Sequence, residues 1–324
     1  MGYFILRRIG WFAVTLFAVV TLSFLLMRSV PGGPFDGDRA LNAIVEKNLE
    51  ARYHLDWPIW KQYLHYVGPL NLDEHGILGD RSRLFGGVLT GDLGPSFSLR
   101  DYSVNDILAE SLPISVTLGG LALLWAIVVG VTAGVLSALR PNTRLDVFVR
   151  VVTTLGIALP NFVIASVLIL LFVFALNWFP VGGWGSLQHL ILPSIALGAP
   201  FCAYIARLTR TGMLEILSED WVRTARAKGL PTRLVLWRHA LKGGLLPVVS
   251  YLGPATAGIL TGSLVIEKIF AIPGTGTHFI KSALNRDYTL ALGVTILYTV
   301  FVYGLNLLVD ISYTLLDPRV KLDG

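Results

Sequence analysis

Five stretches of this 324-residue chain contain no Asp, Glu, Lys or Arg and are long enough to cross a lipid bilayer. A spanning helix needs about 20 mostly apolar residues, so each stretch can hold at least one span. The longest stretch exceeds one helix and is interrupted at residues 177–185, where Asn, Pro, Gly and Trp predict a turn at the membrane surface. The sequence therefore predicts an all-α membrane protein with six transmembrane helices. The five stretches are Ile9–Met27, Leu112–Leu139, Val151–Ala206, Gly243–Ile266 and Tyr288–Val309.

The composition supports this assignment and excludes an ordinary soluble domain. Only 15% of the residues are charged and mean hydropathy is +0.65, whereas soluble globular chains carry about 25% charged residues. Cys202 is the single cysteine, which leaves no disulfide framework and no cysteine-based metal site. The first apolar stretch lacks a small-x-small cleavage signal, so we interpret it as a retained first span.

The distribution of charge predicts the orientation of the chain. Residues 28–111 hold 8 basic and 12 acidic residues, whereas residues 206–245 hold 8 basic and 3 acidic residues. Short basic loops stay in the cytoplasm. We therefore expect both termini and the 206–245 loop to be cytoplasmic. The pI near 9.3 is a topology signal rather than a sign of nucleic-acid binding.

The spans define the expected organisation of the chain. Short helices are predicted in the external segment at Glu46–Tyr53 and Trp57–Val67, from their apolar spacing. The residues Ala271–Gly276 form a short apolar external loop, which could line a substrate entrance or be a plain turn. The predicted parts are a first transmembrane helix at 1–29, an external segment at 30–110, a five-helix core at 111–317 that includes a cytoplasmic loop at 207–243, and a cytoplasmic tail at 318–324.

Two glycine patterns predict close packing between transmembrane helices. The residues Gly130 and Gly134, and likewise Gly258 and Gly262, are four apart on one helix face. Such spacing lets two helices approach closely. Prolines at 160, 193 and 200 are expected to kink the third and fourth spans.

The cytoplasmic loop contains a short helix with clear end signals. Ser218 is a good N-cap, and Glu219 and Asp220 fall in the first turn, where the helix dipole favours anions. Gly229 occupies the C′ position and Pro231 follows it, which predicts a helix end. A helix of about ten residues results.

This loop helix is suited to contact a soluble protein. Its apolar content is limited to Trp221, Val222 and small alanines, whereas a helix resting on anionic lipid would need a larger apolar face. We assign Ala225 to close packing against the partner, Gly229 to the turn, and Arg223 with Arg226 to polar contacts.

At these residues the chain resembles the membrane permeases of ABC importers. In their general loop pattern, Glu-Ala-Ala-x3-Gly-x9-Ile-x-Leu-Pro, only the third position, the glycine and the leucine match, at Ala225, Gly229 and Leu241. Residues 223–229, Arg-Thr-Ala-Arg-Ala-Lys-Gly, are similar to the loop of the peptide and nickel branch. The likeness covers nearly the whole chain and is closest to the B subunits of oligopeptide permeases. It extends to residues 7–32, 53–56, 91–97, 285–288 and 316–319, while 69–87 looks like an insertion to which no function is assigned.

The resemblance implies a fold, a function and partners. The fold is the type I ABC importer permease, and the function is ATP-driven import of oligopeptides across the bacterial inner membrane. The implied partners are a second homologous permease, one or two ATPase subunits and an external substrate-binding protein, besides membrane lipid. By the same resemblance, the residues that couple the chain to the ATPase are Arg223, Thr224, Ala225, Arg226 and Gly229.

No enzymatic activity is expected from the chain itself. It has no Gly-x4-Gly-Lys-Ser/Thr sequence that could hold ATP phosphates. ATP and magnesium are therefore expected in the partner ATPase, and neither a cofactor nor a metal site is expected in this chain. The sequence also shows no His-Glu-x-x-His and no Gly-x-Ser-x-Gly, the motifs of two classes of hydrolase.

Other functions stay open from the sequence. Dipeptides or nickel complexes could be the cargo of the same mechanism. An ion-driven secondary transporter is a different class, which usually carries intramembrane ionisable residues. Asp310 is the only acid inside a predicted span, and we interpret it with Asn306 as polar packing between helices. A structural scaffold would leave the capped loop helix unexplained. The sequence does not give the residues that contact substrate or line the pore.

Overall fold

The structure, a computed structural model, describes residues 2–29, 43–68, 87–99, 101–261 and 263–316. Helices make up almost all of its regular structure. The contacts between Cα atoms divide the chain into two compact units. Unit 1 comprises Met1–Ile114 with Gly274–Tyr303, and unit 2 comprises Ser115–Pro273 with Gly304–Gly324.

Unit 1 contains the first long apolar helix of the chain, most of the last one, and the external segment. Its elements are α1 (Gly2–Ser29), α2 (Ala43–Arg52), α3 (Ile59–Val67), the 3₁₀ turn η1 (Val88–Thr90), the start of α4 (Val104–Leu139), α13 (Thr275–Leu284) and most of α14 (Tyr288–Leu316). The helices α2 and α3 confirm the two predicted in the external segment.

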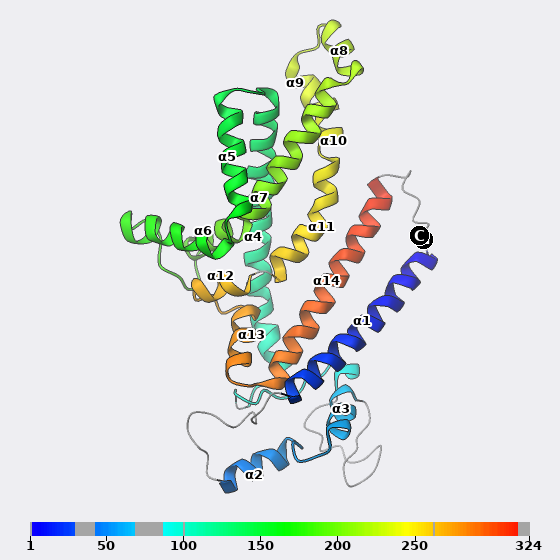
Figure 1. Cartoon of the computed structure of the whole chain (residues 1–324), viewed down its shortest axis with the longest axis vertical. Coiled ribbons are helices and arrows are strands. Elements are labelled where there is room, and N and C mark those ends of the chain that lie inside the picture. Colours follow the sequence, from blue (N-terminus) through cyan, green and yellow to red (C-terminus); the bar gives the residue numbers. More distant parts are fainter. Residues whose placement is uncertain (1, 30–42, 69–86, 100, 262, 317–324) are drawn as a thin grey trace. The chain divides into compact units, whose positions relative to one another are not determined.

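Unit 2 holds the remaining helices (Figure 1). After α4 its elements are α5 (Arg144–Ala158), α6 (Asn161–Leu168), the π-helical η2 (Ile169–Ala175), α7 (Leu187–Ser218), α8 (Asp220–Ala227), α9 (Thr232–Val235), the π-helical η3 (Leu236–Ala240), α10 (Leu241–Gly244), α11 (Leu246–Thr261) and α12 (Leu264–Ile269).

The predicted spans agree with the helices of the described residues. Five helices are long and apolar enough to cross a membrane, or six if the bent pair formed by α5 and the α6–η2 helix counts as one span. This confirms the all-α membrane fold. The five are Leu6–Ser29, Val104–Leu139, Leu187–Ser218, Leu241–Ile269 and Tyr288–Leu308.

Pro160 breaks the third predicted span instead of kinking it. The helix axes on either side of it differ by 112°, and Figure 1 shows α6 running across the end of α5. Leu159 adopts an extended conformation, with φ −85° and ψ 131°. A residue before proline is pushed out of the helical region, which explains why α5 ends there. The predicted interruption after this span is also confirmed, since α7 begins only at Leu187.

The helices α4 and α7 approach each other at backbone distance in unit 2. A Cβ atom added at Gly134 would lie 2.5 Å from the carbonyl oxygen of Ala206, and one at Gly130 would lie 2.7 Å from that of Cys202. Gly198 of α7 makes the reciprocal approach, 2.6 Å from the carbonyl oxygen of Ala122. The close packing predicted from the first glycine pattern is thus confirmed. The second pattern includes Gly262, which lies outside the described residues.

A buried carboxylate fastens the external segment to α14 in unit 1. Asp287 is fully buried and accepts hydrogen bonds from the hydroxyls of Ser96 and Ser98 and from the backbone N–H groups of Ser98 and Leu290. Thr289 extends this anchor by donating to the carbonyl of Pro95 at 2.6 Å. A buried charge needs several such partners. Asp287 therefore fixes residues 95–98 at the start of α14.

The loop predicted between the last two spans is shorter than expected. Thr275 is fully buried and begins α13, with Gly274 as its N-cap. The predicted loop had extended to Gly276. Residues 69–86, the tail from 317 onward and the side chain of Asp310 lie outside the described part, so the predictions made for them are not addressed by the structure.

We predict that Gly134→Ala destabilises the purified chain, whereas Gly120→Ala does not. The new methyl group of the first variant would collide with the Ala206 carbonyl, while nothing lies within 4 Å of a Cβ at Gly120 on the same helix. Overpacking of this kind costs about 1–3 kcal/mol. The measurement is thermal unfolding in detergent micelles. Equal melting temperatures for the two variants would contradict the close approach of α4 and α7.

Candidate functional site

The loop helix predicted from the sequence is α8, an eight-residue helix that follows α7 almost directly. Its N-cap is Glu219, which has an extended conformation with φ −65° and ψ 147° and makes no side-chain capping hydrogen bond. Ser218, which we had predicted as the N-cap, is the last residue of α7, and its hydroxyl donates to the carbonyl of Glu215. That prediction was wrong because the preceding span continues further than its apolar sequence.

The helix α8 ends as the sequence predicted, with Gly229 at the C′ position. Gly229 has φ +78°, a left-handed conformation that favours glycine. The N–H of Leu230 donates to the Ala225 carbonyl at 3.3 Å, and the N–H of Gly229 donates to the Arg226 carbonyl at 2.9 Å. These two bonds form a Schellman motif. They close the helix end and turn the chain toward α9.

The two sides of α8 differ in burial. Val222 is fully buried and Ala225 is half-buried, and α8 contacts α7 and α9. Ala225 thus already packs in part against its own chain. The remaining predicted coupling residues, Arg223, Thr224, Arg226 and Gly229, are exposed. The structure therefore brings all five predicted residues onto one short helix and its cap, and it leaves four of them accessible.

The exposed side of α8 is positively charged. Arg223 pairs with Asp220 of the first turn at 3.4 Å, but the two side chains are 75% and 95% exposed, and such surface pairs contribute little. Among the ion pairs of the described residues, none involves Arg226 or Lys228. The helix thus offers several guanidinium and ammonium donors to a partner with acidic or carbonyl groups.

The helix α7 connects this surface to the membrane-spanning core. It has 32 residues, about 48 Å at 1.5 Å per residue, which exceeds the roughly 30 Å of the hydrocarbon layer. The first third of the predicted loop is therefore a continuation of α7. Only Glu219 separates α7 from α8.

The two ends of the loop are held together by a glycine contact at its base. A Cβ at Gly212 of α7 would lie 2.4 Å from the carbonyl oxygen of Gly244 in α10, and one at Gly244 would lie 2.5 Å from the Met213 sulfur. At this contact, Met213 also packs with Ala138 and Ala240 in a buried cluster. The contact therefore holds α7 and α10 together at the base of the loop.

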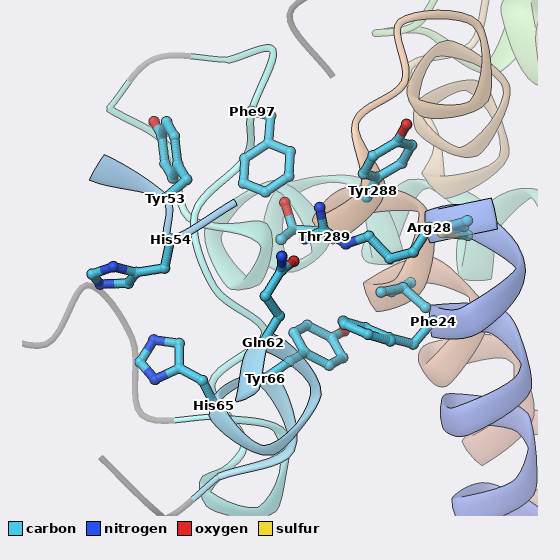
Figure 2. Close-up of a pocket in the computed structure, with 12 residues that line it drawn as sticks. Phe24, Arg28, Tyr53, His54, Gln62, His65, Tyr66, Phe97, Tyr288 and Thr289 are labelled. Atoms are coloured by element: carbon cyan, nitrogen blue, oxygen red, sulfur yellow. The ribbon is translucent and has the colours of Figure 1, made fainter. Parts of the chain in front are cut away.

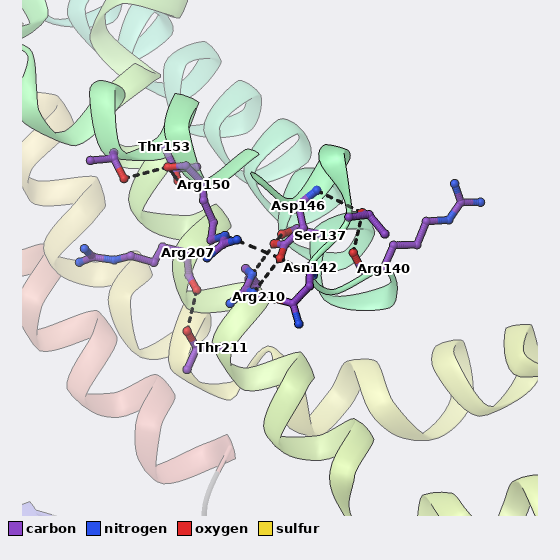
Figure 3. A network of polar contacts seen from close by, with 11 residues as sticks. Ser137, Arg140, Asn142, Asp146, Arg150, Thr153, Arg207, Arg210 and Thr211 are labelled. Carbon is purple, nitrogen blue, oxygen red and sulfur yellow. Dashed lines mark hydrogen bonds and ion pairs between the residues drawn. The ribbon is translucent and has the colours of Figure 1, made fainter. Parts of the chain in front are cut away.

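A buried ion pair links α7 to α5 near the same end of unit 2 (Figure 3). The Asp146 carboxylate is fully buried and accepts two bonds from Arg210, one from Nε at 2.7 Å and one from Nη2 at 3.0 Å. Ser137 of α4 and the backbone N–H of Asn142 donate to the same carboxylate. A bidentate pair with additional donors is strong and geometrically specific. Three helices, α4, α5 and α7, are joined by this one group.

Sequence reasoning did not find this network. The order Thr143-x-x-Asp146 is a helix-start signal, and Thr143 is indeed the N-cap of α5. The partner Arg210 lies 64 residues later, and no local pattern connects the two.

Another residue that was missed is Glu267, one position beyond the predicted end of the fifth span. It is fully buried and accepts hydrogen bonds from Ser115 at 2.8 Å and Ser263 at 2.7 Å.

Comparison with known proteins gives a consistent set of relatives. Residues 130–322 match the family described as binding-protein-dependent transport system inner membrane component. The oligopeptide transport system permease protein OppB of Salmonella typhimurium is 47% identical over 320 residues, 98% of this chain and 99% of that protein. OppB of Escherichia coli K12 is 46% identical over 320 residues, with the same coverage of both chains. The dipeptide transport system permease protein DppB of Bacillus subtilis is 42% identical over 322 residues, 99% of both chains.

A solved structure illustrates the shared fold. It is described as the crystal structure of an amino acid ABC transporter with histidines, and the TM-score is 0.52 with 15% sequence identity. The match covers 64% of this chain and 93% of that one. At this identity the likeness concerns the fold, and it agrees with the predicted type I importer architecture.

We predict that Asp146→Asn lowers the melting temperature by several degrees, because it leaves the Arg210 guanidinium without its charged partner. Arg150→Gln is the matched control. Its Nε is 3.6 Å from Asp146 and its side chain is 50% exposed, so its loss should have little effect. Thermal unfolding of both purified variants makes the comparison. A larger effect of the Arg150 change than of the Asp146 change would contradict this assignment.

Proposed function

The chain belongs to the family of binding-protein-dependent transport system inner membrane components, and on that premise we propose that it carries oligopeptides and is driven through α8 by a separate ATPase subunit. As a member of that family it is a multi-pass permease subunit of an ABC importer. The resemblance of the chain to oligopeptide permeases is confirmed by the full-length relatives. The ATPase, the cargo and the direction of coupling are the proposed parts.

The single observation that best supports the coupling role is the form of α8. It is short, capped at its C-terminal end by a Schellman motif, exposed on its basic side and joined to α7 by one residue. A rigid helix of this kind can fit a cleft in a soluble subunit and transmit a displacement. In this proposal Arg223, Thr224 and Arg226 provide polar contacts, Ala225 allows close packing, and Gly229 sets the turn.

The route of the movement follows from the contacts of α7. When two ATPase subunits close on ATP, α8 is displaced and takes the end of α7 with it. The Arg210–Asp146 pair passes this displacement to α5 and α4, while the Gly212–Gly244 contact passes it to α10. Such coupling needs two discrete arrangements of the packed helices, and a bidentate buried ion pair moves as one body.

The proposed cargo is an oligopeptide. The relatives with 47% and 46% identity are named for oligopeptide transport, and both span nearly the full length of this chain. The relative named for dipeptide transport follows at 42% identity, so a dipeptide is the second candidate.

The proposed assembly contains parts that this chain lacks. It pairs with a second homologous permease, binds one or two ATPase subunits and receives peptide from an external binding protein. ATP and magnesium are held by the ATPase, and this chain provides no cofactor site. Both termini and α8 face the cytoplasm, as the excess of basic residues near α8 indicates.

We predict that Gly229→Val abolishes ATP-driven peptide uptake at normal expression, and that Gly229→Asn retains most of it. A Cβ at this position meets nothing within 4 Å, so only the left-handed backbone conformation opposes substitution. Asn tolerates that conformation and a β-branched residue does not. Uptake of a radiolabelled tripeptide by cells with the complete transporter provides the measurement. Full transport by the Val variant would refute the coupling role of this turn.

We also predict that the purified chain hydrolyses no ATP until the partner ATPase is added.

Arg226→Glu should weaken binding of that ATPase by about tenfold, because it reverses a charge on the exposed side of α8. Lys281→Glu is the matched control, an exposed charge reversal on α13. Co-purification of the ATPase on the tagged chain compares them. Equal recovery with both variants would show that α8 is not the docking element.

A further inference from the structure

A small pocket in unit 1 lies among four parts of the chain that are far apart in sequence (Figure 2). The end of α1, the segment that includes α3, the loop at Phe97 and the start of α14 all contribute to it. Its walls are largely aromatic. Tyr53 and Phe97 meet edge to face at 4.9 Å between ring centroids, and Phe24 stacks on Tyr66 at 5.9 Å.

One side of the pocket carries the guanidinium cation of Arg28, which makes no ion pair with a carboxylate of the described residues. Arg28 is half-buried, and its guanidinium lies over the rings of Phe24 and Tyr288, 5.6 Å and 5.4 Å from their centroids. Among the ion pairs and hydrogen bonds of the described residues, none is made by the Arg28 side chain. Aromatic faces stabilise the charge, but they leave the N–H donors of a guanidinium available. Those donors match a carboxylate.

The opposite side carries a buried acceptor. Gln62 is 8% exposed, and its Nε2 donates to the carbonyls of Leu55 at 3.0 Å and Trp57 at 2.6 Å. Because both partners accept, the orientation of the amide is fixed. Its Oε1 has no hydrogen-bond partner. A buried acceptor left in this state is unfavourable, and it would be satisfied by an N–H from a ligand.

The two groups together define a ligand chemistry. In Figure 2 the guanidinium of Arg28 and the amide of Gln62 point into the same space. A carboxylate beside an N–H group would satisfy both. This pair of groups occurs at the C-terminal residue of every peptide that does not end in proline, and the aromatic walls suit a small apolar side chain there. A cation would be repelled by Arg28.

We propose that this pocket binds the C-terminal residue of a peptide, with its carboxylate on Arg28 and its backbone N–H on Gln62 Oε1. The proposal rests on the proposed function in taking a peptide as cargo, and it adds a recognition site for the free carboxyl end. Because the pocket is small, it holds the end group of the peptide while the rest of the ligand remains outside.

The test is photo-crosslinking to the full chain in phosphatidylcholine nanodiscs. The probe is the tripeptide Ala-benzoylphenylalanyl-Ala, whose photoreactive residue precedes the C-terminal alanine, used once with a free C-terminal carboxylate and once as the amide. We expect the free acid to label residues of the pocket walls and entrance about tenfold more than the amide does, since a charge-assisted bond is lost in the amide. Mass spectrometry of the digested chain locates the label. This comparison uses the unaltered chain and does not depend on a variant that folds.

Two variants sharpen the result. Arg28→Gln should abolish the preference for the acid, whereas Lys47→Gln, which removes an exposed charge from α2, should leave it unchanged. Equal labelling by acid and amide, a preference that survives in Arg28→Gln, or no label in the pocket would overturn the proposal. If Arg28 binds an anionic lipid headgroup instead, the purified chain will retain phosphatidylglycerol and will be labelled equally by the acid and the amide. That outcome also overturns the proposal.

Uptake measured with the same tripeptide in the complete transporter separates this proposal from the proposed function. ATP-driven uptake without pocket labelling would refute the pocket and leave the transport function intact. Labelling with the expected preference but without uptake would support the pocket and count against the proposed cargo or coupling.

Discussion

The backbone contact between α4 and α7 is the constraint on which unit 2 depends. Gly130, Gly134 and Gly198 leave no room for side chains where these helices meet, so the helices pack through their main chains. In a membrane, where apolar burial does not drive helix association, such close packing provides much of the stabilisation. It also makes α7 a fixed element of the core and lets its far end extend beyond the membrane as a rigid support for α8.

The polar groups of the same helix tie this support to neighbouring helices. Arg210 directly follows Thr209, which lies at the glycine contact, and holds the buried Asp146 of α5, with Ser137 of α4 on the same carboxylate. The end of α7 that leads to α8 is therefore tied to two neighbouring helices. Removing a single partner would leave a buried charge uncompensated, so the network favours movement of these helices as one body.

Unit 1 uses buried polar groups in two different ways. Asp287 is saturated by donors from residues 96–98 and Leu290, and it serves to fasten the external segment to α14. The pocket at Arg28 and Gln62 is the opposite case, because a donor group and an acceptor face the same space without satisfying each other. A saturated group stabilises a fold, whereas an unsatisfied pair is suited to recognise a ligand.

The sequence alone determined the membrane class, the approximate spans, the glycine approach at Gly134 and the cap at Gly229, because hydropathy, helix spacing and left-handed turns are local properties. It misplaced the start of α8, since nothing local shows that α7 continues to Ser218. It also gave no sign of the Asp146–Arg210 pair or of the pocket at Arg28. Those depend on residues that are far apart in sequence and meet only when the helices pack, so only the tertiary structure decided them.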